Sequence, residues 1–273
     1  MTVSASTLVR RAALPALALV AAAALAGCST PAAPEPTPTP TATEAADTLS
    51  GTVTVFAAAS LTASFEEIAD LFAAEHPDVT ITFSFAGSSD LATQIVEGAP
   101  ADVFAAANEK TMTTVTDAAM AEGTPVLFAT NVLEIAVPPG NPAGVTDFAS
   151  LADPGVRLVV CAEQVPCGAA TAKIEEATGV VLTPVSEEGA VTDVLGKVVS
   201  GEADAGLVYQ TDVKGAGDSV EGIPFAEADK AVNKYPIAPL AESKNPDAAA
   251  AFVAFVTGPK GLAVLAKAGF GAP

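Results

Sequence analysis

The feature that most constrains the fold is an alternation of strand-like and helix-like segments that begins at Gly51. Residues 52–57 ("TVTVFA") are apolar and rich in β-branched side chains, whereas residues 61–77 repeat their apolar side chains with a helical period up to a proline. Strand, helix and strand in this order, with short connections, are typical of a parallel sheet covered by helices. The same pattern predicts further strands at 79–85 and 101–107 and a helix at 88–98.

The alternation continues through the second half of the chain, with strands expected at 131–140 and 156–162 and helices at 168–179 and 190–203. Residues 205–212 begin as a strand, and residues 246–270 have helical character interrupted at "GPKG". We therefore predict an α/β protein of two lobes, each a mostly parallel sheet flanked by helices. Lobe 1 is expected to contain residues 51–130 and 234–273, and lobe 2 to be inserted as residues 131–233.

The first 50 residues differ from the rest in composition. Residues 1–27 contain two arginines followed by an apolar run, which is typical of a secretory signal peptide; a single-pass membrane anchor is the alternative. The sequence "LAGC" resembles the bacterial lipobox, which predicts that Cys28 is lipidated. Residues 28–50 are rich in Pro and Thr and read as an extended tether. We expect the folded body to lie outside the cell, held at the outer face of the cytoplasmic membrane by lipid.

Two of the three cysteines remain once Cys28 is assigned to the lipid. Cys161 and Cys167 are six positions apart, and a local disulfide is the state expected in an oxidising compartment. A metal site is the less favoured alternative, because His76 is the only histidine and lies far away in the sequence.

The charge balance is strongly acidic, with 32 Asp and Glu against 12 Lys and Arg. A net charge of −20 argues against nucleic acid and against an anionic membrane surface as partners. We expect contact with the membrane only through the lipid anchor.

Two serines stand at corners where a predicted strand meets a predicted helix. Ser60 follows "VFAAA" and Ser88 follows "FSFAG", and either serine could simply cap its helix. The small neighbours would also let a ligand approach the backbone, and helix N-termini attract anions. No Lys or Arg occurs between Arg11 and Lys110, so an anion bound at these corners would be held by neutral donors.

Three segments carry a resemblance to a known family: "TVFAAASLTASFEEIADLF", "FSFAGSSDLATQI" and "EGAPADVFAAANEKTM". They look like the periplasmic molybdate-binding proteins that serve ABC transporters. The resemblance extends to "GLVYQTD" and to the final "AFVAFVTGPKGLAVLAKAGF". It implies the two-lobed, hinged periplasmic-binding-protein fold, in agreement with the alternation.

The resemblance also implies a set of oxyanion-binding groups. It places two hydroxyls on Ser60 and Ser88, a third on Tyr209, and two backbone amides on Cys167 and Val191. Cys167 stands where the family often has alanine, which matters little if only its N–H binds. The alternative for Tyr209 is a core tyrosine whose hydroxyl is satisfied by the protein. No cofactor and no directly bound metal are implied, since molybdenum would be bound as molybdate.

The function implied is capture of molybdate, and of tungstate, in the interlobe cleft and delivery to an ABC permease by a monomeric, non-enzymatic lipoprotein. Sulfate is the main alternative, because it is also a tetrahedral dianion and only pocket size would separate the two. A serine hydrolase would need a G-x-S-x-G elbow and a partner histidine, and neither serine fits that motif.

Other ligand classes of the same fold fit the sequence less well. Ferric-ion receptors need neighbouring tyrosines, and Tyr209 and Tyr235 are far apart in the sequence. Amino-acid or polyamine receptors need Arg or a carboxylate in the cleft, and no Arg lies near a corner. A purely structural lipoprotein would not need two matching serine corners.

Overall fold

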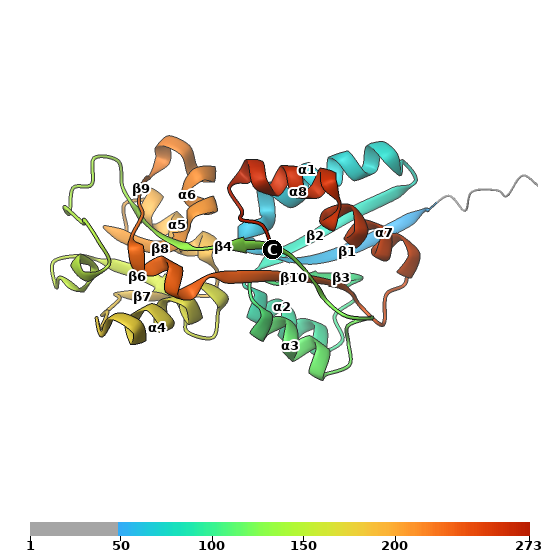
Figure 1. Cartoon of the computed structure of the whole chain (residues 1–273), viewed down its shortest axis with the longest axis horizontal. Helices are drawn as coiled ribbons and strands as arrows, with labels where there is room; N and C mark the ends of the chain where they lie inside the picture. The colour runs from blue at the N-terminus through green and yellow to red at the C-terminus, as the bar shows by residue number, and fades with distance from the viewer. Residues whose placement is uncertain (1–48) are drawn as a thin grey trace, which may run out of the picture. The chain divides into compact units, whose positions relative to one another are not determined.

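The computed structural model describes residues 49–273 (Figure 1). The predicted signal peptide, the lipidation site at Cys28 and nearly all of the tether lie outside the described residues. The described part contains two five-stranded sheets with helices packed on their faces. The predicted class, an α/β fold with two lobes, is confirmed.

The sheet of lobe 1 has the strand order β2-β1-β3-β10-β4. β1 pairs in parallel with β2 and β3, whereas β10 is antiparallel to β3 and β4. Its strands are β1 (Gly51–Ala58), β2 (Val79–Ala86), β3 (Val103–Ala105), β4 (Val126–Asn131) and β10 (Asn233–Pro239). Its helices are α1 (Thr62–Glu75), α2 (Ser88–Val96), α3 (Glu109–Asp117), α7 (Pro246–Thr257) and α8 (Pro259–Ala268).

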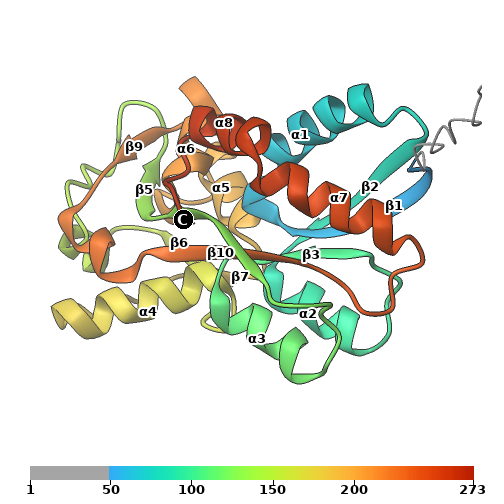
Figure 2. The same ribbon diagram turned by 45° about the vertical axis from the view of Figure 1, so that its right-hand side comes forward.

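The two faces of this sheet are covered by different helices (Figure 2). Val53 and Val55 belong to the apolar cluster formed with α1, α7 and α8, whereas Phe56 belongs to the cluster formed with α2 and α3. Successive strand residues point to opposite faces, so the apolar run of β1 fills both clusters.

The sheet of lobe 2 has the strand order β7-β6-β8-β5-β9, with β5 antiparallel to both of its neighbours. Its strands are β5 (Leu133–Val137), β6 (Leu158–Cys161), β7 (Ser186–Glu188), β8 (Ala205–Tyr209) and β9 (Glu221–Ile223). Its helices are α4 (Pro166–Thr178), α5 (Val191–Val199) and α6 (Gln210–Ala216). Short 3₁₀ helices are η1 (Ala59–Leu61), η2 (Ala149–Ala152), η3 (Gly217–Ser219) and η4 (Ala226–Ala231).

The chain passes between the sheets twice, between Asn131 and Leu133 and again between Ile223 and Asn233. Asn131 and Asn233 are register partners across β4 and β10, so the two crossings lie side by side. The strand that follows each crossing, β5 or β10, is the one that runs against its neighbours. Paired crossings of this kind are the usual place for a hinge between lobes.

Several predicted boundaries were wrong. The strand predicted at 131–140 is shorter: β5 contains only Leu133–Val137, and Asn131 is the last residue of β4 in the other sheet. The segment 205–212 begins as a strand, as predicted: β8 ends at Tyr209 and α6 begins at Gln210. β10 was missed because it contains two prolines; a register shift between Tyr235 and Pro236 accommodates one of them.

Within residues 49–273, no single helix is long and apolar enough to cross a membrane. α7 and α8 meet the criteria of length and composition only as a pair, and that pair bends by 54°. Ala249, Phe252 and Val256 of α7 are fully buried in the lobe 1 core, which accounts for the apolar composition of this segment.

Candidate functional site

A small cavity lies where the corners of lobe 1 meet lobe 2. Its volume is about 10 Å³, room for little more than one water-sized sphere. The described residues that line it are all uncharged, and most are Ala, Gly, Val or Pro. All five residues predicted to bind an oxyanion line it: Ser60, Ser88, Cys167, Val191 and Tyr209.

Four of these residues stand at or near the first turn of a helix. Ser60 lies in η1 after β1, Ser88 is the first residue of α2, Cys167 the second residue of α4 and Val191 the first residue of α5. Among the described residues, the amides of Ser88, Cys167 and Val191 have no hydrogen-bond acceptor. Free N–H groups at a helix start carry partial positive charge, so this cavity favours an anion.

The two serines do not cap their helices, which was the structural alternative for each. The hydroxyl of Ser60 shares a 3.0 Å hydrogen bond with the hydroxyl of Tyr235. The hydroxyl of Ser88 accepts a 3.0 Å bond from the backbone N–H of Ala107. Neither Leu61 nor Gly87, the N-caps of α1 and α2, offers a side-chain cap. Both serines therefore line the cavity and bond to neighbouring protein groups, and neither caps a helix.

Tyr209 ends β8 and is 1% exposed. Its hydroxyl oxygen lies 3.0 Å from the side-chain nitrogen of Asn233. Burial, with the nearby Tyr235 and Asp212, raises the pKa of Tyr209 well above its usual value, so the hydroxyl keeps its proton at neutral pH. The backbone N–H of Tyr209 donates to the carboxylate of Asp212 at 2.9 Å, and burial raises the pKa of Asp212 to about 7.

Tyr235 is a site-adjacent residue that the sequence analysis did not select. Its ring centroid lies 6.0 Å from that of Tyr209. The two tyrosines are therefore neighbours in the fold, although they are far apart in the sequence. Burial raises the pKa of Tyr235 as well, which disfavours the phenolate that a ferric ion would need. The described residues also contain no cluster of three His, Cys, Asp or Glu side chains that could hold a metal.

A disulfide supports the loop that presents Cys167. The structure joins Cys161 at the end of β6 to Cys167 in the first turn of α4. The next residue, Gly168, packs so closely on this loop that a Cβ there would overlap the carbonyl of Ala162. The bond and the close packing together fix the position of the Cys167 amide.

The two lobes touch beside the cavity. The hydroxyl of Ser89 donates to the carbonyl of Gln164 at 2.6 Å, which links α2 of lobe 1 to the loop before α4. A Cβ on Gly87 would overlap the carbonyl oxygen of Gly189. These contacts show that the lobes are closed around the five groups.

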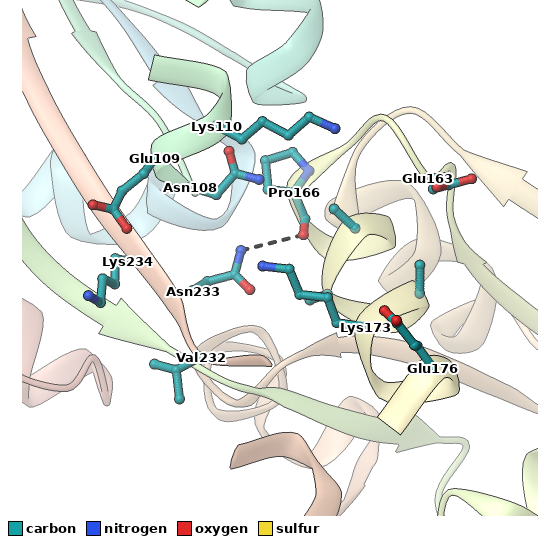
Figure 3. Close-up of a pocket in the computed structure, with 13 residues that line it drawn as sticks. Asn108, Glu109, Lys110, Glu163, Pro166, Lys173, Glu176, Val232, Asn233 and Lys234 are labelled. Atoms are coloured by element: carbon teal, nitrogen blue, oxygen red, sulfur yellow. Dashed lines mark hydrogen bonds between the residues drawn. The ribbon is translucent and has the colours of Figure 1, made fainter. Parts of the chain in front are cut away.

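A second, larger cleft of about 340 Å³ lies on the other side of Pro166 and Asn233 (Figure 3). The charged residues of the described part that line it are three lysines and three glutamates, whose charges balance: Lys110, Lys173, Lys234, Glu109, Glu163 and Glu176. Figure 3 shows Asn233 at this boundary, with its side chain directed to the carbonyl of Pro166.

The fold agrees with comparison to known proteins. The family of bacterial extracellular solute-binding proteins matches residues 53–271. This chain belongs to that family. A bacterial extracellular solute-binding protein is a binding protein for transport rather than an enzyme, and it works outside the cytoplasm.

One relative of this solute-binding protein is the molybdate-binding protein ModA of Mycobacterium tuberculosis, 48% identical, with the alignment covering 81% of this chain and 85% of ModA. A periplasmic molybdate-binding protein of Azotobacter vinelandii shares the fold, with a TM-score of 0.72 and 23% identity over 81% of this chain and 99% of that chain. The sulfate-binding protein SubI of M. tuberculosis also shares the fold, with a TM-score of 0.67 and 21% identity over 80% and 86% of the two chains.

Proposed function

We propose that this solute-binding protein captures molybdate, and also tungstate, between its lobes and delivers it to an ABC permease. The observation that carries the proposal is the convergence of five neutral donor positions on one uncharged cavity between the lobes. The high identity to a mycobacterial molybdate-binding protein over most of both chains supports the same ligand.

The groups assigned to the ligand are hydrogen-bond donors. The hydroxyls of Ser60, Ser88 and Tyr209 and the amides of Cys167 and Val191 would each donate to an oxygen of the anion. A fully deprotonated dianion offers only acceptors, and hydrogen bonds to a charged oxygen are the stronger kind. Helix N-termini supply the balancing partial charge, so no Lys or Arg is required.

Binding is proposed to follow lobe closure. Ser60 and Ser88 belong to lobe 1, whereas Cys167, Val191 and Tyr209 belong to lobe 2. An oxyanion would meet the two serines first, and rotation at the paired crossings would then bring up the remaining donors. The closed form is the one proposed to dock on the permease.

Sulfate is the second candidate, because the fold also serves a sulfate-binding protein. It is also a tetrahedral dianion and suits the same donors. Its shorter bonds to oxygen would leave some donors out of reach, so molybdate and tungstate are preferred here. The close sequence relationship is also to a molybdate-binding protein rather than to a sulfate-binding one.

We also propose that the protein is anchored to the membrane by lipid. Lipid on Cys28 would hold the body at the outer face of the cytoplasmic membrane, and a single acyl chain binds weakly, so several are expected. The tether of residues 28–50 would let a monomeric body reach the permease. No cofactor is proposed beyond the oxyanion itself.

Calorimetric titration of the purified protein with molybdate, tungstate and sulfate tests the proposal. We expect one site per chain, with molybdate and tungstate binding at least tenfold more tightly than sulfate. The same anions should raise the melting temperature in that order, because a ligand that binds only the folded state stabilises it. Absence of molybdate binding, or tighter binding of sulfate, would overturn the assignment.

A further inference from the structure

We infer that Asn233 is a positioning residue that makes the site select oxyanions lacking a proton, because its amide fixes the direction in which Tyr209 donates. Asn233 is the first residue of β10, directly after the second crossing, and is 5% exposed. It does not line the cavity and would not touch the ligand. This inference rests on the proposed function.

The orientation of the Asn233 amide follows from its neighbours. The atom assigned as nitrogen lies 2.8 Å from the carbonyl oxygen of Ala107 and 3.4 Å from that of Pro166 (Figure 3). Carbonyl oxygens can only accept, so the group that faces both of them must be the NH₂ and not the amide oxygen.

The same nitrogen lies 3.0 Å from the hydroxyl oxygen of Tyr209. Because the nitrogen only donates, the oxygen of Tyr209 must accept this bond. The single proton of Tyr209 then points away from Asn233. The hydroxyl of Tyr235 is also within reach of it. A dianion in the cavity is the stronger acceptor because it is charged.

The direction in which Ser88 donates is fixed in the same way. Its oxygen accepts from the N–H of Ala107, and the carbonyl of that alanine accepts from Asn233. Asn233 thus contacts Ala107 of lobe 1 and both Pro166 and Tyr209 of lobe 2. In this closed arrangement Asn233 therefore sets the direction of the Tyr209 proton.

The consequence is rejection of a protonated anion. Near neutral pH phosphate still carries a proton, which needs an acceptor inside the cavity. With Asn233 in place, Tyr209 does not act as that acceptor, because its oxygen already accepts from Asn233 and its proton points to the ligand. Without it, the Tyr209 hydroxyl could turn to donate to a carbonyl that Asn233 leaves unpaired, and would present a lone pair to the ligand. Loss of Asn233 should therefore weaken the binding of molybdate and lower the free-energy cost of binding phosphate.

A double-mutant cycle tests this coupling. Molybdate and phosphate affinities are measured by calorimetry for the wild type, Asn233→Leu, Tyr209→Phe and the double variant. Asn233→Leu should lower the ratio of molybdate to phosphate affinity about tenfold or more, the effect of one unmet donor or acceptor. In the Tyr209→Phe background the same change should alter the ratio by less than about twofold.

The matched control is Thr211→Val. The hydroxyl of Thr211 accepts a 2.7 Å bond from Asn131, the register partner of Asn233, at the same corner of lobe 2. This change removes a comparable buried hydrogen bond without touching the Tyr209 hydroxyl, and the affinity ratio should stay within about twofold of the wild type. If Asn233→Leu does not fold, Asn233→Ser replaces it.

An unchanged ratio in a folded Asn233 variant, or an equal change with and without the Tyr209 hydroxyl, would overturn the inference while leaving the proposed function intact. A ratio that falls as much in Thr211→Val would show a general effect of the hinge and would also overturn it. Failure of the proposed function would appear differently, as a wild-type protein that binds no molybdate.

Discussion

The hydroxyl oxygen of Ser88 lies 3.0 Å from the backbone nitrogen of Ala107 and accepts its hydrogen bond. Ser88 follows β2 and Ala107 follows β3, so this bond ties together the ends of the two strands that flank β1. The bond uses the oxygen as an acceptor and leaves the serine proton free. The geometry of the protein thus prepares Ser88 to donate to a ligand.

Removing one donor hydroxyl should weaken molybdate binding and leave the fold intact. Ser60→Ala, Ser88→Ala and Tyr209→Phe should each cost about 1–3 kcal/mol of binding free energy, because an oxygen of the bound anion loses one donor. Calorimetric titration gives the affinities, and thermal melts without ligand check the fold. A variant that binds molybdate as tightly as the wild type would remove that residue from the site.

The anion selectivity and the salt dependence of binding should be those of an uncharged cavity that offers only hydrogen-bond donors. Phosphate should bind about ten- to a hundredfold more weakly than molybdate, because its proton would be buried without an acceptor. Among residues 49–273, no charged side chain lines the cavity, so raising the salt concentration should weaken molybdate binding only slightly. Titrations at two salt concentrations measure both effects. A steep loss with salt would indicate a cation in contact with the ligand.

The corners of lobe 1 could be predicted because their signals are local. The strand at 79–85 and the helix beginning at Ser88 were both visible in short stretches of sequence, and parallel pairing of β1 with β2 brings the two serine corners to one edge. The spacing of Cys161 and Cys167 likewise indicated the disulfide that the structure contains. The backbone positions at Cys167 and Val191 came from the family resemblance and not from the residues themselves.

Tyr235 and Asn233 could not be predicted, because their roles depend on contacts far along the chain. The Tyr235 hydroxyl is hydrogen-bonded to Ser60, which lies 175 positions earlier in the sequence. The Asn233 amide is hydrogen-bonded to Ala107, which lies 126 positions earlier. The segment that holds both contains prolines and no clear alternation, so β10 itself was not visible in the sequence. Its place in the sheet depends on pairing with β3 and β4.

The stability of the protein should fall with rising pH through Asp212. Burial raises the pKa of Asp212 to about 7, so from about pH 4 to 7 the folded protein holds a proton that the unfolded chain has lost. The free energy of unfolding then falls by up to about 1.4 kcal/mol per pH unit from this group. Asp212→Asn keeps an oxygen for the N–H of Tyr209 and should flatten this slope. Urea unfolding from pH 5 to 8 measures it, and equal slopes in both proteins would refute the prediction.

Opening the disulfide should lower both stability and affinity. Replacing Cys161 and Cys167 by serine frees a short loop, and loop entropy gives a loss of about 2 kcal/mol in the free energy of unfolding. The amide of Cys167 then loses its fixed position, so molybdate binding should weaken as well. Urea unfolding and calorimetry of the double variant measure the two effects. Wild-type affinity in a destabilised variant would show that the bond supports the fold alone.

Lobe closure should be disfavoured by a single methyl group at Gly87. A Cβ on this residue would overlap the carbonyl oxygen of Gly189 in the opposite lobe, and overlap of this kind costs about 1–3 kcal/mol. Gly87→Ala should therefore fold normally but bind molybdate about five- to a hundredfold more weakly. Gly189→Ala is the matched control, because the nearest atom to its Cβ is a carboxylate oxygen of Asp90 at 3.8 Å, an ordinary contact. Calorimetry gives the affinities, and small-angle scattering with and without molybdate reports closure. Equal affinity and equal compaction in the two variants would show that the approach of Gly87 to Gly189 does not limit closure.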